Sequence, residues 1–394
     1  MTPEGSEKLS RLAVQIIAQH RLRSWSALKW QGRVYHRRGL KIVVIHSRQG
    51  FWLRGVAVKI RASTLDDVLH EVFERLLRTG RIVPETTKGK KLGKTREASG
   101  VVIELTNPRA RMSRTEVRHY LLFSCLGKLL WYLAGSDDYG FIRYYIPEYP
   151  NESGVPHLRD AYGPRLRSAK KDQLLWITEI LRKKPNSRRA VIPFYGMQDT
   201  YTDLSEVPCT CTLQFLLRGD RLELLAHMRS NDAYVGLPND IFAFTMIQEL
   251  IARSLGVEVG RYKHLVGSLH LYEVNWKAAT KFLAEGWQRK HTMPFMPLGD
   301  QFESLTSVLK LEKALRTGRN PRTPSSLPGY WRDIVQLLRI HKADRDDASS
   351  AEISRLRKGM SSDAYGPFIE TKQRRARKRE AEQRAGSSGT LFPL

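Results

Sequence analysis

Residues 221–240 read RLELLAHMRSNDAYVGLPND and combine an alternating apolar run, a polar Arg-Ser-Asn-Asp run and a Gly-Leu-Pro step. The alternation over Arg221 to Met228 predicts a strand, and the run before it, Thr210 to Leu217, predicts another. Arg218-Gly219-Asp220 predicts a hairpin between them, because a glycine in a short polar link suits a tight turn. Beyond the polar run, Phe242 to Leu255 predicts a strongly apolar helix. The segment therefore indicates a protein that mixes strands and helices.

Helical and strand patterns continue on both sides of this segment. A helix is predicted from Leu65, with Gly80 ending it. A nearly all-apolar pattern predicts a buried helix over residues 114–134, whereas residues 84–100 are polar and predict an exposed basic loop. Shorter patterns predict helices over residues 7–20, 170–183 and 330–340, and strands over residues 41–45, 56–60, 190–194 and 262–272.

These patterns divide the chain into three parts. We expect a mixed N-terminal extension over residues 1–64, a main domain over residues 65–300, and a basic C-terminal extension, partly helical or disordered, over residues 301–394. With 394 residues and 41% hydrophobic content, the chain is long enough for a large core. Because it shows neither a long apolar run nor a secretory signal pattern, we expect a cytoplasmic protein without a membrane span.

Charge and cysteine content narrow the class of partners. The formal net charge of +26 predicts attraction to phosphate, in a nucleotide or in a polymer. The basic run over residues 372–379 suits either a solvated segment or a nucleic-acid contact. Cys125, Cys209 and Cys211 are too few for a disulfide framework and lack the further ligands of a structural zinc site. We therefore expect free thiols and no metal.

Several short motifs follow one another at defined separations. They are Ser187-Arg188-Arg189, Pro208-Cys209, Arg229-Ser230-Asn231-Asp232, Gly236-Leu237-Pro238-Asn239-Asp240 and His270-Leu271-Tyr272. In order and separation they resemble the thymidylate synthase family over about residues 65–276. The resemblance implies an α/β (α+β) fold with a large twisted mixed β-sheet flanked by helices, plus N- and C-terminal extensions. It also implies a homodimer that packs sheet against sheet.

The resemblance further implies roles for single residues. Cys209 matches the family's nucleophile, and Tyr162 matches the tyrosine of its Tyr-Gly segment. The matching substrate-binding residues are Arg229 and Ser230 for phosphate, Arg188 and Arg189 for the phosphate in the partner subunit's site, Arg96 for phosphate from a flexible loop, His270 and Tyr272 for the sugar, and Asp232 near the pyrimidine and the folate. The implied substrate is a pyrimidine nucleoside monophosphate, and the implied cofactor is 5,10-methylenetetrahydrofolate.

Pyrimidine chemistry agrees with these roles. C5 of the ring is a poor nucleophile until a group adds at C6, and a thiolate is the best side chain for that addition. Arginines around the thiol would also clamp a phosphate dianion. Taken alone, Cys209 would be read as a small core residue on a strand, and Arg188-Arg189 as a solvated turn.

Two positions depart from the family pattern. Asp240 stands where thymidylate synthases carry an asparagine that pairs with uracil. An ionised carboxylate only accepts hydrogen bonds and suits the N4 amino group of cytosine, as in the family's deoxycytidylate hydroxymethylases; Asp240 also suits a helix N-cap. Lys128, in LGKLLWYL, stands where the family has its catalytic glutamate. It would act by pairing with Asp240 or by donating a proton from an ammonium of depressed pKa.

The C-terminal part is the third departure. Family synthases end soon after the sheet in a tail that closes over the folate, whereas about a hundred residues follow here and residues 391–394 do not match that tail. Access of water favours hydroxymethylation over methylation. We therefore predict a one-carbon transferase that 5-hydroxymethylates CMP or dCMP through a Cys209–C6 adduct, with catalytic roles for Asp240, Lys128 and Tyr162. The alternatives are a thymidylate synthase acting on dUMP and a catalytically weak family member that binds RNA or DNA.

Overall fold

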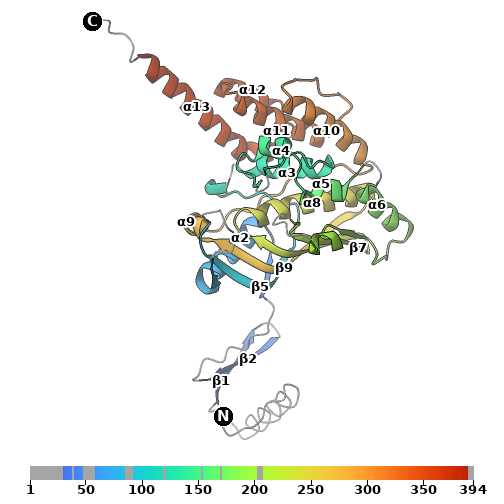
Figure 1. Cartoon of the computed structure of the whole chain (residues 1–394), viewed down its shortest axis with the longest axis vertical. Helices are drawn as coiled ribbons and strands as arrows, with labels where there is room; N and C mark the ends of the chain where they lie inside the picture. Colours follow the sequence, from blue (N-terminus) through green and yellow to red (C-terminus); the bar gives the residue numbers. More distant parts are fainter. Residues whose placement is uncertain are drawn as a thin grey trace. The chain divides into compact units, whose positions relative to one another are not determined.

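The computed structural model describes residues 30–37, 40–47, 58–84, 92–118, 121–151, 154–168, 171–201 and 207–388. They belong to two units that divide between Val56 and Ala57 (Figure 1). In the first unit, β1 (Trp30–Arg37) pairs antiparallel with β2 (Leu40–Ser47), which confirms the strand predicted at residues 41–45. The helix predicted over residues 7–20 lies outside the described residues.

The second unit is built on a seven-stranded mixed sheet, as predicted. Its strands run in the order β3-β5-β9-β8-β7-β6, with β4 also paired to β5; the β3/β5 and β8/β9 pairs are parallel and the others antiparallel. The strands are β3 (Val58–Ala62), β4 (Arg81–Val83), β5 (Thr95–Leu105), β6 (Val191–Pro193), β7 (Thr210–Arg218), β8 (Arg221–Asp232) and β9 (Glu258–Tyr272).

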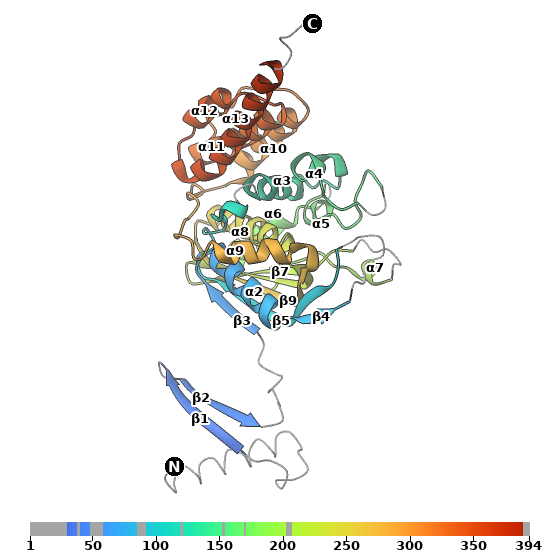
Figure 2. The same ribbon diagram turned by 90° about the vertical axis from the view of Figure 1, so that its left-hand side faces the viewer.

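Helices cover one face of this sheet, with α2 and α8 in contact with its strands (Figure 2). The described helices are α2 (Leu65–Thr79), α3 (Leu121–Leu133), α4 (Tyr139–Tyr145), α5 (Tyr162–Leu166), α6 (Gln173–Lys183), α7 (Met197–Thr200), α8 (Gly236–Ser254), α9 (Trp276–Ala284), α10 (Phe302–Arg316), α11 (Gly329–Arg345), α12 (Ser350–Lys358) and α13 (Gly366–Ser388), with 3₁₀ turns at Glu116–Arg118, Glu273–Asn275 and Asp363–Tyr365. None of the described helices is long and apolar enough to cross a membrane.

Strands β7, β8 and β9 change phase along one band, and this change positions the site. On β9 the buried residues are Val266 and then Leu269, so the inward face shifts at Gly267. On β8 they are Met228 and then Asn231. Pairing also skips Gly100 on β5, and the β7/β8 register shifts between Thr210 and Thr212. A Cβ at Gly267 would lie 2.7 Å from the Arg229 carbonyl oxygen, so β8 and β9 meet closely only with glycine there.

The structure corrects several predicted boundaries. The second unit begins before residue 65, because β3 pairs in parallel with β5. The predicted loop over residues 84–100 is a strand from Thr95 onward, since these polar residues pair with β9. The helix predicted over residues 114–134 begins only at Leu121. Helix α8 begins at Gly236, six residues before the predicted start, because a proline is tolerated in a first helical turn.

In the described residues beyond 300, helices α10, α11 and α13 pack on α3 and α4, and α12 packs on α11 and α13. The Tyr145 hydroxyl of α4 donates to Glu312 of α10 at 2.9 Å. His341 of α11 stacks on Phe123 of α3 and on Tyr145, with ring centroids 5.7 and 5.0 Å apart. The C-terminal end of α13 points away from the sheet in both views (Figures 1 and 2).

Candidate active site

Cys209 lies immediately before β7, beside the neighbouring strand β8. Its carbonyl oxygen accepts a hydrogen bond from the Arg229 amide at 2.9 Å, and the Ser230 hydroxyl donates to its Sγ at 3.6 Å. The Arg229 guanidinium donates to the carbonyls of Val207 (3.0 Å) and Pro208 (2.9 Å), which lead into Cys209. The structure thus brings a half-buried thiol, a hydroxyl and an exposed arginine together, as the sequence predicts.

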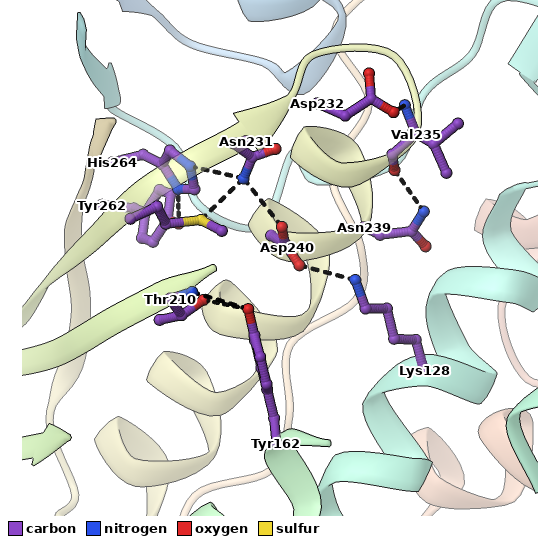
Figure 3. A network of polar contacts seen from close by, with 11 residues as sticks. Lys128, Tyr162, Thr210, Asn231, Asp232, Val235, Asn239, Asp240, Tyr262 and His264 are labelled. Carbon is purple, nitrogen blue, oxygen red and sulfur yellow. Dashed lines mark hydrogen bonds and ion pairs between the residues drawn. The ribbon is translucent and has the colours of Figure 1, made fainter. Parts of the chain in front are cut away.

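Asp240, in the first turns of α8, pairs with Lys128 of α3 (Figure 3). The Lys128 Nζ lies 2.9 Å from Asp240 Oδ1, and the two side chains are only 13% and 5% exposed. Burial is the largest single effect and disfavours the ammonium, but the Asp240 carboxylate together with Tyr149 and Tyr162 raises the pKa of Lys128 above its ordinary value. Pairing with Asp240, one of the two roles predicted for Lys128, is therefore present. The depressed pKa of the other role is contradicted.

Asp240 also belongs to a buried network that the sequence analysis missed (Figure 3). The Asn231 amide nitrogen lies 3.0 Å from Asp240 Oδ2 and 3.3 Å from His264 Nε2. His264 Nδ1 is in turn 2.5 Å from the Tyr262 hydroxyl. Burial lowers the pKa of His264 to about 4, against a smaller opposing effect of Asp240, so the ring is neutral at pH 7. Asn231 was visible in the Arg-Ser-Asn-Asp run, but nothing in the pattern linked it to β9.

Tyr162, at the start of α5, connects the Cys209 strand to the helical layer. Its hydroxyl oxygen accepts from the backbone nitrogen and the Oγ1 of Thr210, both at 2.9 Å. Its ring stacks on Tyr132 with centroids 4.9 Å apart. Burial is the main cause that raises the pKa of Tyr162 well above 10. Because both contacts are to the oxygen, the phenolic proton is left to donate elsewhere, next to Cys209.

Asp232 and the two predicted sugar-binding residues lie where β8 and β9 end. The Asp232 carboxylate accepts from the backbone nitrogens of Tyr234 (2.9 Å) and Val235 (3.0 Å), and so shapes the turn into α8. Burial raises the pKa of Asp232, although those two bonds and nearby His270 oppose it. The rings of His270 and Tyr272 meet edge to face at 5.0 Å. The Ala233 amide donates to the His270 carbonyl at 2.7 Å, which ties the two strand ends together.

Two comparisons with known proteins bear on the family of this chain. The family model described as thymidylate synthase matches residues 70–311 of the chain. The chain belongs to the thymidylate synthase family. The deoxyuridylate hydroxymethyltransferase of Bacillus phage SP01 is 30% identical over 218 residues, which are 51% of this chain and 55% of that protein. The chain thus matches about half the length of this relative.

The other predicted phosphate-binding arginines of this family member are Arg96, Arg188 and Arg189. Arg96 is not on a flexible loop: it lies in β5 opposite Leu271, and its guanidinium stacks over the Trp276 ring at 4.8 Å. Arg188 and Arg189 are exposed in the turn before β6. Among the described residues, no hydrogen bond or ion pair joins their side chains to Cys209. A role in a partner's site stays a prediction.

Carboxylates contact most cations of the basic run in the C-terminal helix α13. Asp344 of α11 binds Lys372 at 2.5 Å and Arg379 at 3.1 Å, with Arg375 at 3.9 Å. Arg374 pairs with Glu116, and Lys378 with Glu382, at 2.8 and 3.7 Å. Lys372 and Arg379 therefore hold α13 on α11, whereas Arg374, Arg375 and Lys378 stay more than half exposed.

Proposed function

We propose that this protein transfers a one-carbon unit to C5 of a pyrimidine nucleoside monophosphate and makes the 5-hydroxymethyl product, with CMP or dCMP as preferred substrate. The observation that carries the choice of base is Asp240, whose two oxygens accept from Lys128 at 2.9 Å and from Asn231 at 3.0 Å. A carboxylate held by two donors acts as an acceptor toward the base as well. The N4 amino group of cytosine is a donor that fits it.

Cys209 would begin the reaction by forming a bond from its sulfur to C6 of the base. The electrons of the C5–C6 double bond then move into the ring, and C5 becomes nucleophilic. Arg229 and Ser230, which lie beside the thiol, would hold the phosphate and so fix the base over the sulfur. Tyr162 would exchange a proton close to the same position, because its hydroxyl is fixed by Thr210.

Lys128 would replace the family glutamate by a different kind of chemistry. Addition at C6 of a cytosine places negative charge on C5, N3 and O2, whereas N4 stays an amino donor. The Lys128 ammonium, kept charged beside Asp240, can donate to N3 while Asp240 accepts from N4. The pair thus presents one donor and one acceptor to a cytosine edge.

Methylenetetrahydrofolate would supply the one-carbon unit when bound. The residues near the nucleotide site fit such a cofactor. Val235 exposes 48% of its surface directly beside Asp232, so an apolar contact and a carboxylate lie together, as a pterin ring requires. Each Asp232 oxygen accepts one backbone amide and keeps a lone pair for a ligand.

A second candidate is hydroxymethylation of deoxyuridylate. The relative from phage SP01 carries that activity in its name. The same side-chain pair could read uracil, with Lys128 donating to O4 and Asp240 accepting from N3–H. We rank this candidate second because it requires the base to sit with N3, not the exocyclic group, at Asp240.

A homodimer is the assembly we propose for this activity. The sheet face that the helices leave uncovered carries apolar residues that are only half-buried, among them Val102, Leu216, Leu225 and Leu265, between polar ones such as Gln214 and Lys263. A second copy packed there would remove them from water. Arg188 and Arg189, exposed at the edge strand β6, would then reach the partner's nucleotide site.

Release of tritium from [5-³H]CMP, dCMP, UMP and dUMP with methylenetetrahydrofolate tests the proposal. We expect release from a cytidine nucleotide, a product heavier by CH₂O, and loss of release in Cys209→Ser. Cys211→Ser is the matched control, since it removes a thiol two residues along the same strand. Release only from dUMP with a gain of CH₂O would establish the second candidate. A gain of CH₂ would show methylation, and release from none of the four would refute both.

A further inference from the structure

The buried network behind Asp240 has a fixed direction of hydrogen bonding. Asn231, His264 and Tyr262 are at most 3% exposed, so their partners come from the protein. The neutral His264 ring has one donor and one acceptor nitrogen. Its Nε2 faces the Asn231 amide nitrogen at 3.3 Å and must accept; its Nδ1 must therefore carry the proton, 2.5 Å from the Tyr262 oxygen.

The orientation of the Asn231 amide has its own support. The Met228 sulfur, 2.8 Å away, can only accept a hydrogen bond, so the NH₂ group and not the amide oxygen faces it. The same NH₂ group reaches Asp240 Oδ2 at 3.0 Å. A protonated Asp240 would present its own hydrogen to that donor or to the Lys128 ammonium, and one hydrogen bond would be lost.

We infer that Asn231, held by His264 and Tyr262, is a positioning residue that keeps Asp240 a hydrogen-bond acceptor and thereby sets which pyrimidine edge the site takes. The consequence for base choice rests on the proposed function, but the network itself does not. Asn231 also follows Ser230 on β8, so the strand whose Ser230 would hold the phosphate also carries the residue that orients Asp240.

The direction of the network can be measured without any nucleotide. In protein labelled with ¹⁵N-histidine, the His264 signals, assigned by their loss in His264→Gln, should show a neutral ring protonated on Nδ1 from pH 7 down to about pH 5. A ring protonated on Nε2 would point its hydrogen at the Asn231 amide. That result would overturn the inference.

Base preference is measured by calorimetric binding of CMP, dCMP, UMP and dUMP in the absence of folate. Asn231→Asp is nearly isosteric and places a second carboxylate against Asp240; the two must share a proton, which allows Asp240 to donate. We expect the preference for cytosine over uracil nucleotides to fall about tenfold, the value of one charged hydrogen bond. Tyr262→Phe, which releases His264 Nδ1, should lower it in the same direction by about twofold or more.

Thr245→Val is the matched control. Thr245 is fully buried on the same helix as Asp240, and its hydroxyl bonds only to backbone oxygens of that helix. It should leave the preference unchanged. An unchanged preference in Asn231→Asp as well would overturn the inference. Wild-type protein that binds none of the four nucleotides would instead refute the proposed function, while the histidine spectrum still decides the network.

Discussion

Replacing Lys128 by methionine should lower the melting temperature of the protein by about 6 °C. The substitution keeps the side-chain volume but leaves Asp240, whose side chain is 5% exposed, with Asn231 as its remaining donor. Removing one partner of a buried ion pair costs about 3–5 kcal/mol, and the remaining Asn231 bond places this site near 3 kcal/mol. For a chain of this size each kcal/mol shifts the melting temperature by roughly 2 °C.

A double-mutant cycle separates the pair from general packing. Asp240→Asn should also destabilise the protein, because it leaves the buried Lys128 ammonium without a counter-charge. Lys128→Met combined with Asp240→Asn removes both charges and should melt close to the wild-type temperature. Calorimetry at pH 7.5 without ligand gives the four values. Lys183→Met is the control: it removes an ion pair of similar length, 3.0 Å to Glu179, from a lysine that is 73% exposed. It should change the melting temperature by less than about 2 °C.

The pH dependence of the cycle follows from the raised pKa of Lys128. A lysine whose folded pKa lies above the ordinary 10.5 contributes stability that is fully present below pH 10.5 and is lost only above it. The difference between wild type and Lys128→Met should therefore stay constant from pH 7 to 10. Single-variant losses that add up fully in the double variant would mean that the two charges are not coupled, and would refute the reasoning.

Three further predictions concern assembly, acid stability and nucleic-acid binding. Mixing inactive Cys209→Ala with inactive Arg189→Ala should restore tritium release to about a quarter of wild type, because half of the random dimers carry one complete site; no recovery would place Arg189 in its own chain's site. Burial lowers the pKa of His341 to about 3, so stability should fall below pH 6.5, and calorimetry should show that His341→Phe removes up to about 4 kcal/mol of that loss. RNA binding at low salt should weaken steeply as the salt concentration rises and should be unaffected by Cys209→Ala. It should weaken in Arg375→Glu with Arg377→Glu, because both side chains are exposed and Arg375 lies 3.9 Å from its carboxylate partner.

Elements that depend on local signals were predicted correctly from the sequence. The Thr64 hydroxyl accepts from the Asp67 amide and Gly80 closes the last turn, so both ends of α2 are set by neighbours in the chain. The β7/β8 hairpin has the same origin, because Gly219 takes a positive φ of 59° in a short link. The order and separation of the motifs were enough to predict the family, because the fold fixes the spacing of the strand ends along the chain.

Contacts between segments far apart in the sequence determine the features that the sequence analysis did not predict. Residues 116–118 have helical spacing, yet the Glu285 carboxylate binds the amides of Glu116 and Val117 and the helix proper starts later. Polar residues 95–100 form a strand only because β9 lies alongside. The phase change on β8 between Met228 and Asn231 hid Asn231, because simple alternation along β8 does not predict that it faces the same interior as His264.

In the proposed match to the family motifs, Lys128 and Asp240 depart from the family pattern in compensating ways, which argues against lost catalysis. A glutamate at position 128 would set a second carboxylate within hydrogen-bond distance of Asp240, and an asparagine at position 240 would leave a buried ammonium without its counter-charge. Lys128→Glu should therefore abolish tritium release although it restores the family residue. Lys128→Glu with Asp240→Asn restores both family residues and should shift nucleotide binding toward dUMP. An increase in catalysis in Lys128→Glu alone would show instead that Lys128 impairs the reaction. A lysine that serves the reaction could not be replaced with a gain in rate by a glutamate placed beside Asp240.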